Sequence, residues 1–536
     1  MKTTDMANHQ NGDRLSWGDT VFLHLERDGM PLHIAGTSVL EGVISKEEFR
    51  AFIESKLPVL TRYRQRVEAA PFNLCPPTWE YDPEFDLGNH VSEITLKRGT
   101  DTEFKAVVGK LLSKTMDRTR PLWDFTLVSG LKGNHTGLIS RVHHCLADGI
   151  AAVGAMNVIM TATPEVQPLP KPTRRAPAPP PKDPLTSLFD SLIGAYSNLV
   201  QRALAAQSDL LDFTERMAAG GGELPTAEFA RLLPELTAPT ANLCFNVNCQ
   251  GPLKVAWVEL PLEDLKAIRK ACGTTVNDVL LALVTSTIQR YVELHGDSIK
   301  GQLFRMMVPV NTRGADSPDE LGNRISLVPV TVPLDIRNPR KLLAAVHERT
   351  EFLKRGHVAE LVSLAGGLVS FVATPLQAMA GPIAGQLPIT PFNLVCTSVP
   401  GPQFPLYLLG HKMLRWYPYV PIGGRMALNC AILTYNGTTY FGFSGDVHAA
   451  PDLQKLEGLL KLSFEELKKA AGVQAPRKKA ARSKAKAAPV VRIALAKTLR
   501  PTDPTLVRLK VVQKAESERV QEPTVEQGNL PEQLIA

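Results

Sequence analysis

Two adjacent histidines are the residues of this chain best suited to chemistry. They open a seven-residue run, His143 to Gly149, which continues Cys-Leu-Ala-Asp-Gly after the pair. A neutral imidazole, whose ordinary pKa is about 6.5, can take the proton of an alcohol at the moment its oxygen attacks an electrophile. The run therefore predicts a histidine that acts as a general base.

The elements around the run indicate which histidine faces the reaction. Residues 122–131 and 137–144 are rich in apolar and β-forming residues, and a Lys-Gly-Asn turn signal lies between them, so they are predicted to form a hairpin. Side chains alternate along a strand, and His143 and His144 should therefore point in opposite directions. We predict that His144 is the base and that His143 has a supporting role.

The aspartate and glycine that end the run are predicted to be structural. Asp148 follows a turn and need not touch His144, so we expect it to form an ion pair that holds the turn. Gly149 allows the chain to bend into a helix expected at residues 150–160.

Length and composition are those of a globular protein with more than one domain. The chain has 536 residues, of which 44% are hydrophobic and 21% charged. Its seven cysteines are scattered without a Cys-x-x-Cys pair, which indicates reduced thiols and a cytosolic setting. The polar segment 1–13 has no apolar core, so no secretory signal is expected.

A proline-rich segment divides the chain. Residues 167–184 contain eight prolines in eighteen positions, and proline fixes φ and lacks an N–H donor, so a semi-rigid linker is predicted. The predicted organisation is an N-terminal domain at 12–165, a linker with a helical connector at 166–240, a C-terminal domain at 241–474, and a disordered tail at 475–536.

The net charge of +7 belongs to this tail. Nine basic residues and no acidic one lie in 477–500, and four basic and six acidic residues lie in 501–536, which leaves 1–476 neutral. Such a tail could bind an anionic membrane or nucleic acid, or be a solvated extension.

Residues 361–411 carry no Asp, Glu, Lys or Arg. Because glycines and prolines interrupt them, we expect a buried core or lipid-facing surface rather than membrane spans.

Motifs of several other enzyme classes are missing. The sequence has no P-loop, no Gly-x-Gly-x-x-Gly after a strand, no metal-spaced Cys/His cluster and no Gly-x-Ser-x-Gly. A Gly-Asp-Ser sequence at 296–298 resembles the serine site of a carrier protein, but it directly follows a helix inside the second domain, and we discount it. We expect neither a metal ion nor a cofactor.

Further motifs accompany the histidine run. They are Leu15-Ser16-Trp17-Gly18-Asp19 followed by Phe22-Leu23, Pro121-Leu122-Trp123, Asn277-Asp278, and Val399-Pro400-Gly401-Pro402. Together with the histidines, this set resembles the bacterial wax ester synthase/acyl-CoA:diacylglycerol acyltransferase family over most of residues 12–470. One departure is Ser398, where the family usually has asparagine.

The resemblance implies an α/β fold of two chloramphenicol-acetyltransferase-like domains with the active-site channel between them. It implies an O-acyltransferase that moves a long-chain acyl group from acyl-CoA, a substrate rather than a cofactor, to diacylglycerol or a long-chain alcohol. It also implies a cytoplasmic protein bound peripherally to the inner face of the membrane or to lipid bodies, without a nucleic-acid partner.

Several motif residues have two interpretations. Asn277 and Asp278 belong to a capping-type box that begins at Thr275, or they contact substrate. Arg313 is the expected partner of Asp148, because an arginine after a similar strand has this role in related acyltransferases; otherwise it is an exposed residue at a strand end.

The remaining motifs are expected beside the reaction channel. Pro121, Leu122 and Trp123 are expected to bind substrate or shape the site. Residues 399–402 are expected to form a rigid turn beside the channel.

Two other functions stay open. The chain could be a condensation-type enzyme that uses carrier-bound acyl donors, and CoA esters would then fail in a donor screen. It could also be a lipid-binding protein of the same fold without activity, against which the intact His144 and Asp148 argue.

Overall fold

The computed structural model describes residues 14–147, 154, 156, 158–165, 240–311, 325–355 and 392–473. Asp148, Gly149 and Arg313 lie outside the described residues. So do the proline-rich segment, the tail, and most of the charge-free run.

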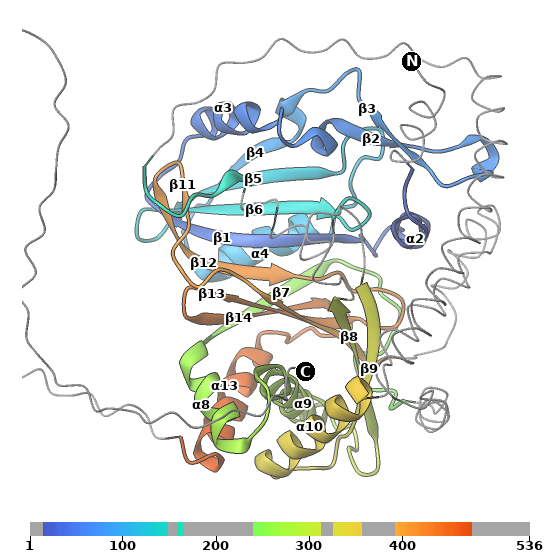
Figure 1. Cartoon of the computed structure of the whole chain (residues 1–536), viewed down its shortest axis with the longest axis vertical. Helices are drawn as coiled ribbons and strands as arrows, with labels where there is room; N and C mark the ends of the chain where they lie inside the picture. The colour runs from blue at the N-terminus through green and yellow to red at the C-terminus, as the bar shows by residue number, and fades with distance from the viewer. Residues whose placement is uncertain are drawn as a thin grey trace, which may run out of the picture. The chain divides into compact units, whose positions relative to one another are not determined.

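Two six-stranded sheets form the framework (Figure 1). The first has the order β11-β12-β1-β6-β5-β4, and its strands are β1 (His33–Glu41), β4 (Val91–Thr95), β5 (Trp123–Leu131), β6 (His135–His143), β11 (Tyr407–Leu408) and β12 (His411–Tyr419). The second has the order β7-β14-β13-β10-β8-β9, and its strands are β7 (Leu253–Pro261), β8 (Leu303–Asn311), β9 (Ile325–Pro333), β10 (Leu394–Pro400), β13 (Leu428–Tyr435) and β14 (Thr438–Asp446). A small sheet pairs β2 (Gln65–Glu68) with β3 (Thr78–Tyr81).

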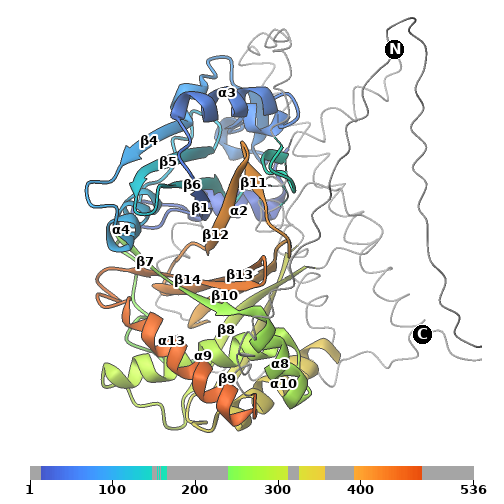
Figure 2. The same ribbon diagram turned by 90° about the vertical axis from the view of Figure 1, so that its left-hand side faces the viewer.

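The helices fall into groups around these sheets. The described α-helices are α2 (Trp17–Leu25), α3 (Lys46–Lys56), α4 (Asp101–Leu112), α8 (Leu262–Cys272), α9 (Val276–Leu294), α10 (Pro339–Arg355) and α13 (Lys455–Ala470). Short 3-10 turns are η1 (Thr61–Arg64), η2 (Pro71–Asn73) and η3 (Leu87–Asn89). Figure 2 shows α8, α9, α10 and α13 gathered on one side of the second sheet, away from the first.

Local sequence signals produce the elements that they predict. β5 and β6 form the expected antiparallel hairpin, and β6 ends at His143, one residue earlier than predicted. β13 and β14 flank Asn436 and Gly437, whose φ angles of 45° and 79° suit a tight two-residue turn. Ser45 caps α3 by accepting a hydrogen bond from the Glu48 amide.

The C-terminal half of the chain completes the first sheet. β12 pairs antiparallel with β1, with Ala35 opposite Tyr419. β14 of the second sheet crosses close to β12, where a Cβ added at Gly442 would lie 2.0 Å from the Pro418 carbonyl oxygen. Only glycine allows that approach. One hydrophobic core accordingly mixes side chains from residues 34–160 with others from residues 249–440.

No single helix among the described residues is long and apolar enough to cross a membrane. In this part of the chain, the pair α8 and α9 reaches that length and composition when taken together, but it is bent by 101° at the break between the two helices. Most side chains of α9 are buried within the protein.

Candidate active site

A cavity of about 840 Å³ lies among residues contributed by both sheets. Its lining is mostly apolar: Val142 comes from β6, Met307 from β8, Trp416 from β12 and Ile432 from β13. A cavity of this size and character suits a large apolar ligand. Few polar side chains reach it, and His144 is one of them.

The two histidines lie in different surroundings. His144 is the first residue after β6, and its half-buried ring borders the cavity. His143 is 0% exposed and does not line the cavity. The predicted divergence of the two side chains is therefore present, and only His144 is placed to meet a bound substrate.

Helix α2 supplies the face against which His144 rests. The Phe22 and His144 rings are stacked with centroids 3.9 Å apart and an interplanar angle of 9°. Ser16 begins this helix, because its side chain accepts a hydrogen bond from the Asp19 amide. The Leu-Ser-Trp-Gly-Asp motif thus starts the helix that brings Phe22 to the histidine.

The environment of His144 keeps its imidazole neutral. Burial is the main cause that lowers the pKa of His144, which is about 4. A hydrogen bond to the backbone of the same residue works to raise this pKa, and His143 lowers it slightly. The ring can therefore accept a proton at neutral pH.

Backbone hydrogen bonds fix the chain on both sides of the pair. The His143 amide donates to the Leu122 carbonyl at 2.9 Å, and the His144 amide donates to the Leu32 carbonyl at 3.0 Å. Trp123, the next residue of the Pro-Leu-Trp motif, lines the cavity, and its indole N–H donates to the Tyr63 carbonyl at 2.7 Å. The motif therefore anchors the histidine strand and also shapes the cavity wall.

A buried carboxylate faces His143. Glu26 Oε1 lies 3.4 Å from His143 Nε2 and accepts a hydrogen bond from the Leu32 amide at 3.0 Å. Its Oε2 accepts one from Arg118 at 3.0 Å. Burial works to raise the pKa of Glu26, but His143, Leu32 and Arg118 outweigh it and bring that pKa down to about 2. Glu26 is therefore ionised at neutral pH.

Cys145, the residue after His144, is not an available nucleophile. Its side chain is 3% exposed, and burial together with the charges of Asp19 and Glu26 raises the pKa of its thiol well above the usual value. It packs with Leu15, Leu23 and Leu122 in a small apolar cluster.

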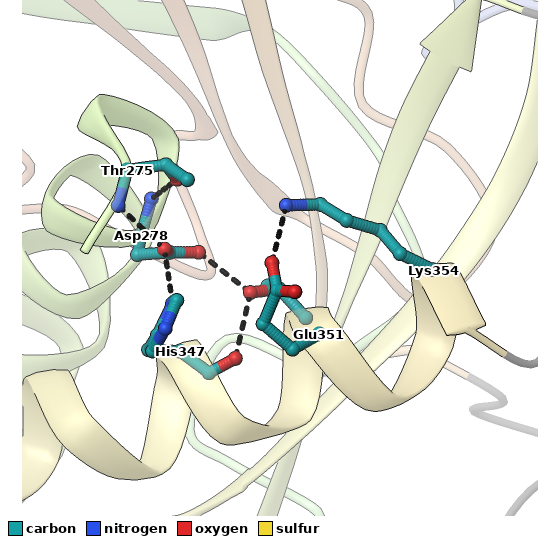
Figure 3. A network of polar contacts seen from close by, with 6 residues as sticks. Thr275, Asp278, His347, Glu351 and Lys354 are labelled. Atoms are coloured by element: carbon teal, nitrogen blue, oxygen red, sulfur yellow. Dashed lines mark hydrogen bonds and ion pairs between the residues drawn. The ribbon is translucent and has the colours of Figure 1, made fainter. Parts of the chain in front are cut away.

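Asp278 has a structural role in its surroundings (Figure 3). It forms a reciprocal capping box with Thr275 at the start of α9. Its carboxylate also accepts hydrogen bonds from Thr350 at 2.6 Å and contacts His347 Nδ1 at 2.8 Å. The Asp278 side chain is 0% exposed. Neither Asp278 nor Asn277 lines the cavity. These contacts favour the capping interpretation over contact with substrate.

The Val-Pro-Gly-Pro segment borders the cavity. Val399 and Pro400 line it, but they are the last two residues of β10 rather than part of the expected turn, because they pair with Leu433 and Thr434 of β13. After the strand, the Gly401 amide donates to the Thr434 carbonyl at 2.9 Å, which ties this segment to β13. Ser398 also lines the cavity and is exposed.

The predicted positions of Asp148, Gly149 and Arg313 lie outside the described residues, so their ion pair and turn stay predictions. Within the described ranges, no group of three or more His, Cys, Asp or Glu side chains could hold a metal ion.

Comparison with known proteins decides the family. The model of the wax ester synthase/diacylglycerol acyltransferase catalytic domain matches residues 15–280, and that of the family's C-terminal domain matches residues 321–468. The chain belongs to this family. It is an acyltransferase.

Curated relatives of this acyltransferase come from mycobacteria. The probable diacylglycerol O-acyltransferase tgs1 of Mycobacterium tuberculosis is 28% identical over 436 residues, which cover 79% of this chain and 89% of the relative. The probable diacylglycerol O-acyltransferase tgs2 of the same organism is 26% identical over 478 residues, covering 86% and 100%.

Solved structures support the fold of the acyltransferase. The wax ester synthase/diacylglycerol acyltransferase from Marinobacter aquaeolei VT8 matches with a TM-score of 0.59 at 24% identity, covering 86% of this chain and all of that one. The first condensation domain of the calcium-dependent antibiotic synthetase matches with a TM-score of 0.54 at 16% identity, covering 86% and 96%. This match shows that the fold is shared with condensation domains.

Two residues of the acyltransferase site were not predicted as site residues. Phe22 belongs to a motif that we had identified, but nothing in its local sequence indicates that it stacks on His144. Glu26 follows it by four residues, which places both on one face of α2, and this helical spacing was the available signal.

Proposed function

We propose that this acyltransferase transfers a long-chain acyl group from acyl-CoA to the hydroxyl of diacylglycerol or of a long-chain alcohol, with His144 as general base. The observation that carries the proposal is the neutral His144 ring at the wall of a large, mostly apolar cavity. Two long hydrocarbon chains need such a lining, because their burial is favoured by removal of apolar surface from water.

The reaction proceeds in one complex of enzyme, acyl-CoA and alcohol. His144 accepts the hydroxyl proton while the oxygen attacks the thioester carbonyl. The tetrahedral adduct then expels the CoA thiolate, and the imidazolium returns the proton to it. An ester and free CoA result, so no cofactor or metal is consumed. A positioned base of this kind contributes about 10²–10⁴ in rate.

The test is product analysis with purified enzyme. Palmitoyl-CoA is supplied with diacylglycerol and hexadecanol in competition, and triacylglycerol and wax ester are quantified. His144→Ala should lower ester formation by about 10² or more while the thermal unfolding midpoint stays close to that of the wild type. Turnover near the wild-type rate in that variant would exclude His144 as the base.

A donor screen separates this function from condensation-type chemistry. Palmitoyl-CoA and a palmitoyl thioester on a carrier protein are compared at equal concentration with one acceptor. Turnover with the CoA ester supports the proposal. Turnover with the carrier-bound donor alone contradicts it, and binding of both lipids without any product points to a non-catalytic protein.

We further propose that the acyltransferase works at a membrane or lipid-body surface on the cytoplasmic side, because both acceptors reside in lipid phases. The basic residues between 477 and 500 would strengthen attraction to anionic lipid. Flotation of the full chain with vesicles of anionic and of zwitterionic lipid tests this. Recovery of the protein free of vesicles in both cases would contradict it.

A further inference from the structure

Glu26 connects both histidines to a single helix end. It is the C-cap residue of α2, and its carboxylate reaches the His143 ring and the Leu32 amide. The Leu32 carbonyl in turn accepts the His144 amide. One side chain thus contacts one histidine directly and is linked to the other through the backbone of a single residue, Leu32.

The hydrogen-bond pattern orients His143 toward this carboxylate. His143 Nδ1 accepts a hydrogen bond from the Cys145 amide at 3.2 Å, so a neutral ring carries its hydrogen on Nε2. His143 Nε2 lies 3.4 Å from Glu26 Oε1, which is longer than an ordinary hydrogen bond, so the carboxylate is the charged group that faces this nitrogen. His143 is thereby hydrogen-bonded at Nδ1 and faces the Glu26 carboxylate at Nε2.

Burial of a carboxylate raises the free energy of the folded state unless new contacts offset the lost hydration. The Glu26 side chain is 3% exposed, and its pKa is lowered, which shows that the ionised form is the one that the site stabilises. Arg118 alone could pair with a glutamate at the surface, since its own side chain is 46% exposed. The buried position of the Glu26 side chain brings it to His143 and Leu32 as well as to Arg118.

We propose that Glu26 is a positioning residue, which holds His143 and the Leu32 backbone so that His144 keeps its orientation at the cavity wall. Glu26 exchanges no proton with substrate. Phe22, one helical turn earlier, contacts the opposite part of the same arrangement by stacking on His144. Phe22 and Glu26 together therefore place the C-terminal end of α2 against the two histidines, where it holds His144 in position. This inference rests on the proposed role of His144.

Two substitutions at Glu26 and one control test the proposal. Glu26→Ala removes the contacts to His143 and Leu32, and kcat should fall by about 10²-fold, as expected when a catalytic group is misplaced by about 1 Å. KM for palmitoyl-CoA should change by less than about threefold, because the cavity lining is intact. Glu26→Gln keeps an oxygen that can accept from Leu32 and His143, and it should recover kcat to within about tenfold of the wild type.

Glu103 provides a matched control, because its carboxylate likewise accepts backbone hydrogen bonds, from Lys97, Arg98 and Gly99, ahead of α4. Glu103→Ala should leave kcat unchanged. Thermal unfolding is measured for all variants, and kcat is normalised to folded protein.

The outcomes separate this inference from the proposed function. A normal kcat in Glu26→Ala, with His144→Ala inactive, overturns the inference alone. The inference is also overturned if kcat falls equally in Glu26→Gln and Glu26→Ala and the decrease in each variant parallels the decrease in its unfolding midpoint. Glu26 would then only stabilise the fold. An active His144→Ala variant overturns the general-base function itself.

Discussion

Phe22 lies flat against the imidazole of His144, with ring centroids 3.9 Å apart and planes inclined by 9°. This relationship joins α2, the first helix that the structure describes, to the end of a strand more than a hundred residues later. It fixes the plane of the His144 ring, and under the proposed mechanism it would present the π-face of an aromatic ring to the imidazolium formed when His144 accepts a proton.

Phe22→Leu should therefore lower kcat by about 3- to 10-fold, because loss of the stack costs about 0.5–1.5 kcal/mol in the protonated state. Steady-state kinetics with palmitoyl-CoA measure the effect. Phe464→Leu removes a buried ring from α13 in the other core and serves as a control for loss of stability. An unchanged kcat in Phe22→Leu would show that the stack serves packing only.

The pH profile should report the lowered pKa of His144. The base works only when it is neutral, and burial lowers its pKa to about 4, so kcat/KM should stay level as pH falls from 8 to 5 and decline only near 4. An acid limb near 6.5 would contradict the buried, neutral state. Initial rates must be measured on folded protein at each pH.

Stability should fall over the same acidic range. Burial lowers the pKa values of His33, His90 and His144 below 6.5 in the folded state. Between 6.5 and those values the unfolded chain binds more protons than the folded protein, so the free energy of unfolding decreases as pH falls. The decrease is at most about 1.4 kcal/mol per pH unit for each of these histidines. Urea unfolding at pH 7.5, 6 and 5 measures the slope. His33→Gln should make the slope smaller.

The Asp278 network should affect stability rather than chemistry. Asp278→Asn and Thr350→Val each weaken the buried hydrogen bonds between α9 and α10, and each should lower the free energy of unfolding by about 2 kcal/mol. Urea denaturation gives this value, and kcat per folded molecule should stay the same. A selective loss of kcat in Asp278→Asn would favour direct contact with substrate.

The basic tail should contribute to membrane attachment. Deletion of residues 476–536 should weaken partition to anionic vesicles, since each Lys or Arg near such a surface contributes about 1 kcal/mol. A full-length chain with the nine basic residues of 477–500 replaced by glutamine serves as the matched variant. Equal vesicle binding by all three proteins would assign attachment to the folded body.

Local sequence determined many of the elements and indicated His144 as the candidate base. The hairpin that ends at His143, the tight turn at Asn436 and the cap at Thr275 each depend on interactions within a few residues, which short motifs encode directly. The alternation of side chains likewise separated His143 from His144. The set of motifs across the chain identified the family.

Tertiary structure alone decided what surrounds the base. Phe22 and Glu26 reach the histidines because β1 pairs with β6 and α2 packs beside their ends. The addition of β12 to the first sheet brings Trp416 and Tyr419 to the same cavity. Such contacts depend on strand register and on packing between distant segments, which minimise exposed apolar surface over the whole chain. No short motif carries that information, so the chemistry could be predicted locally while the support of His144 could not.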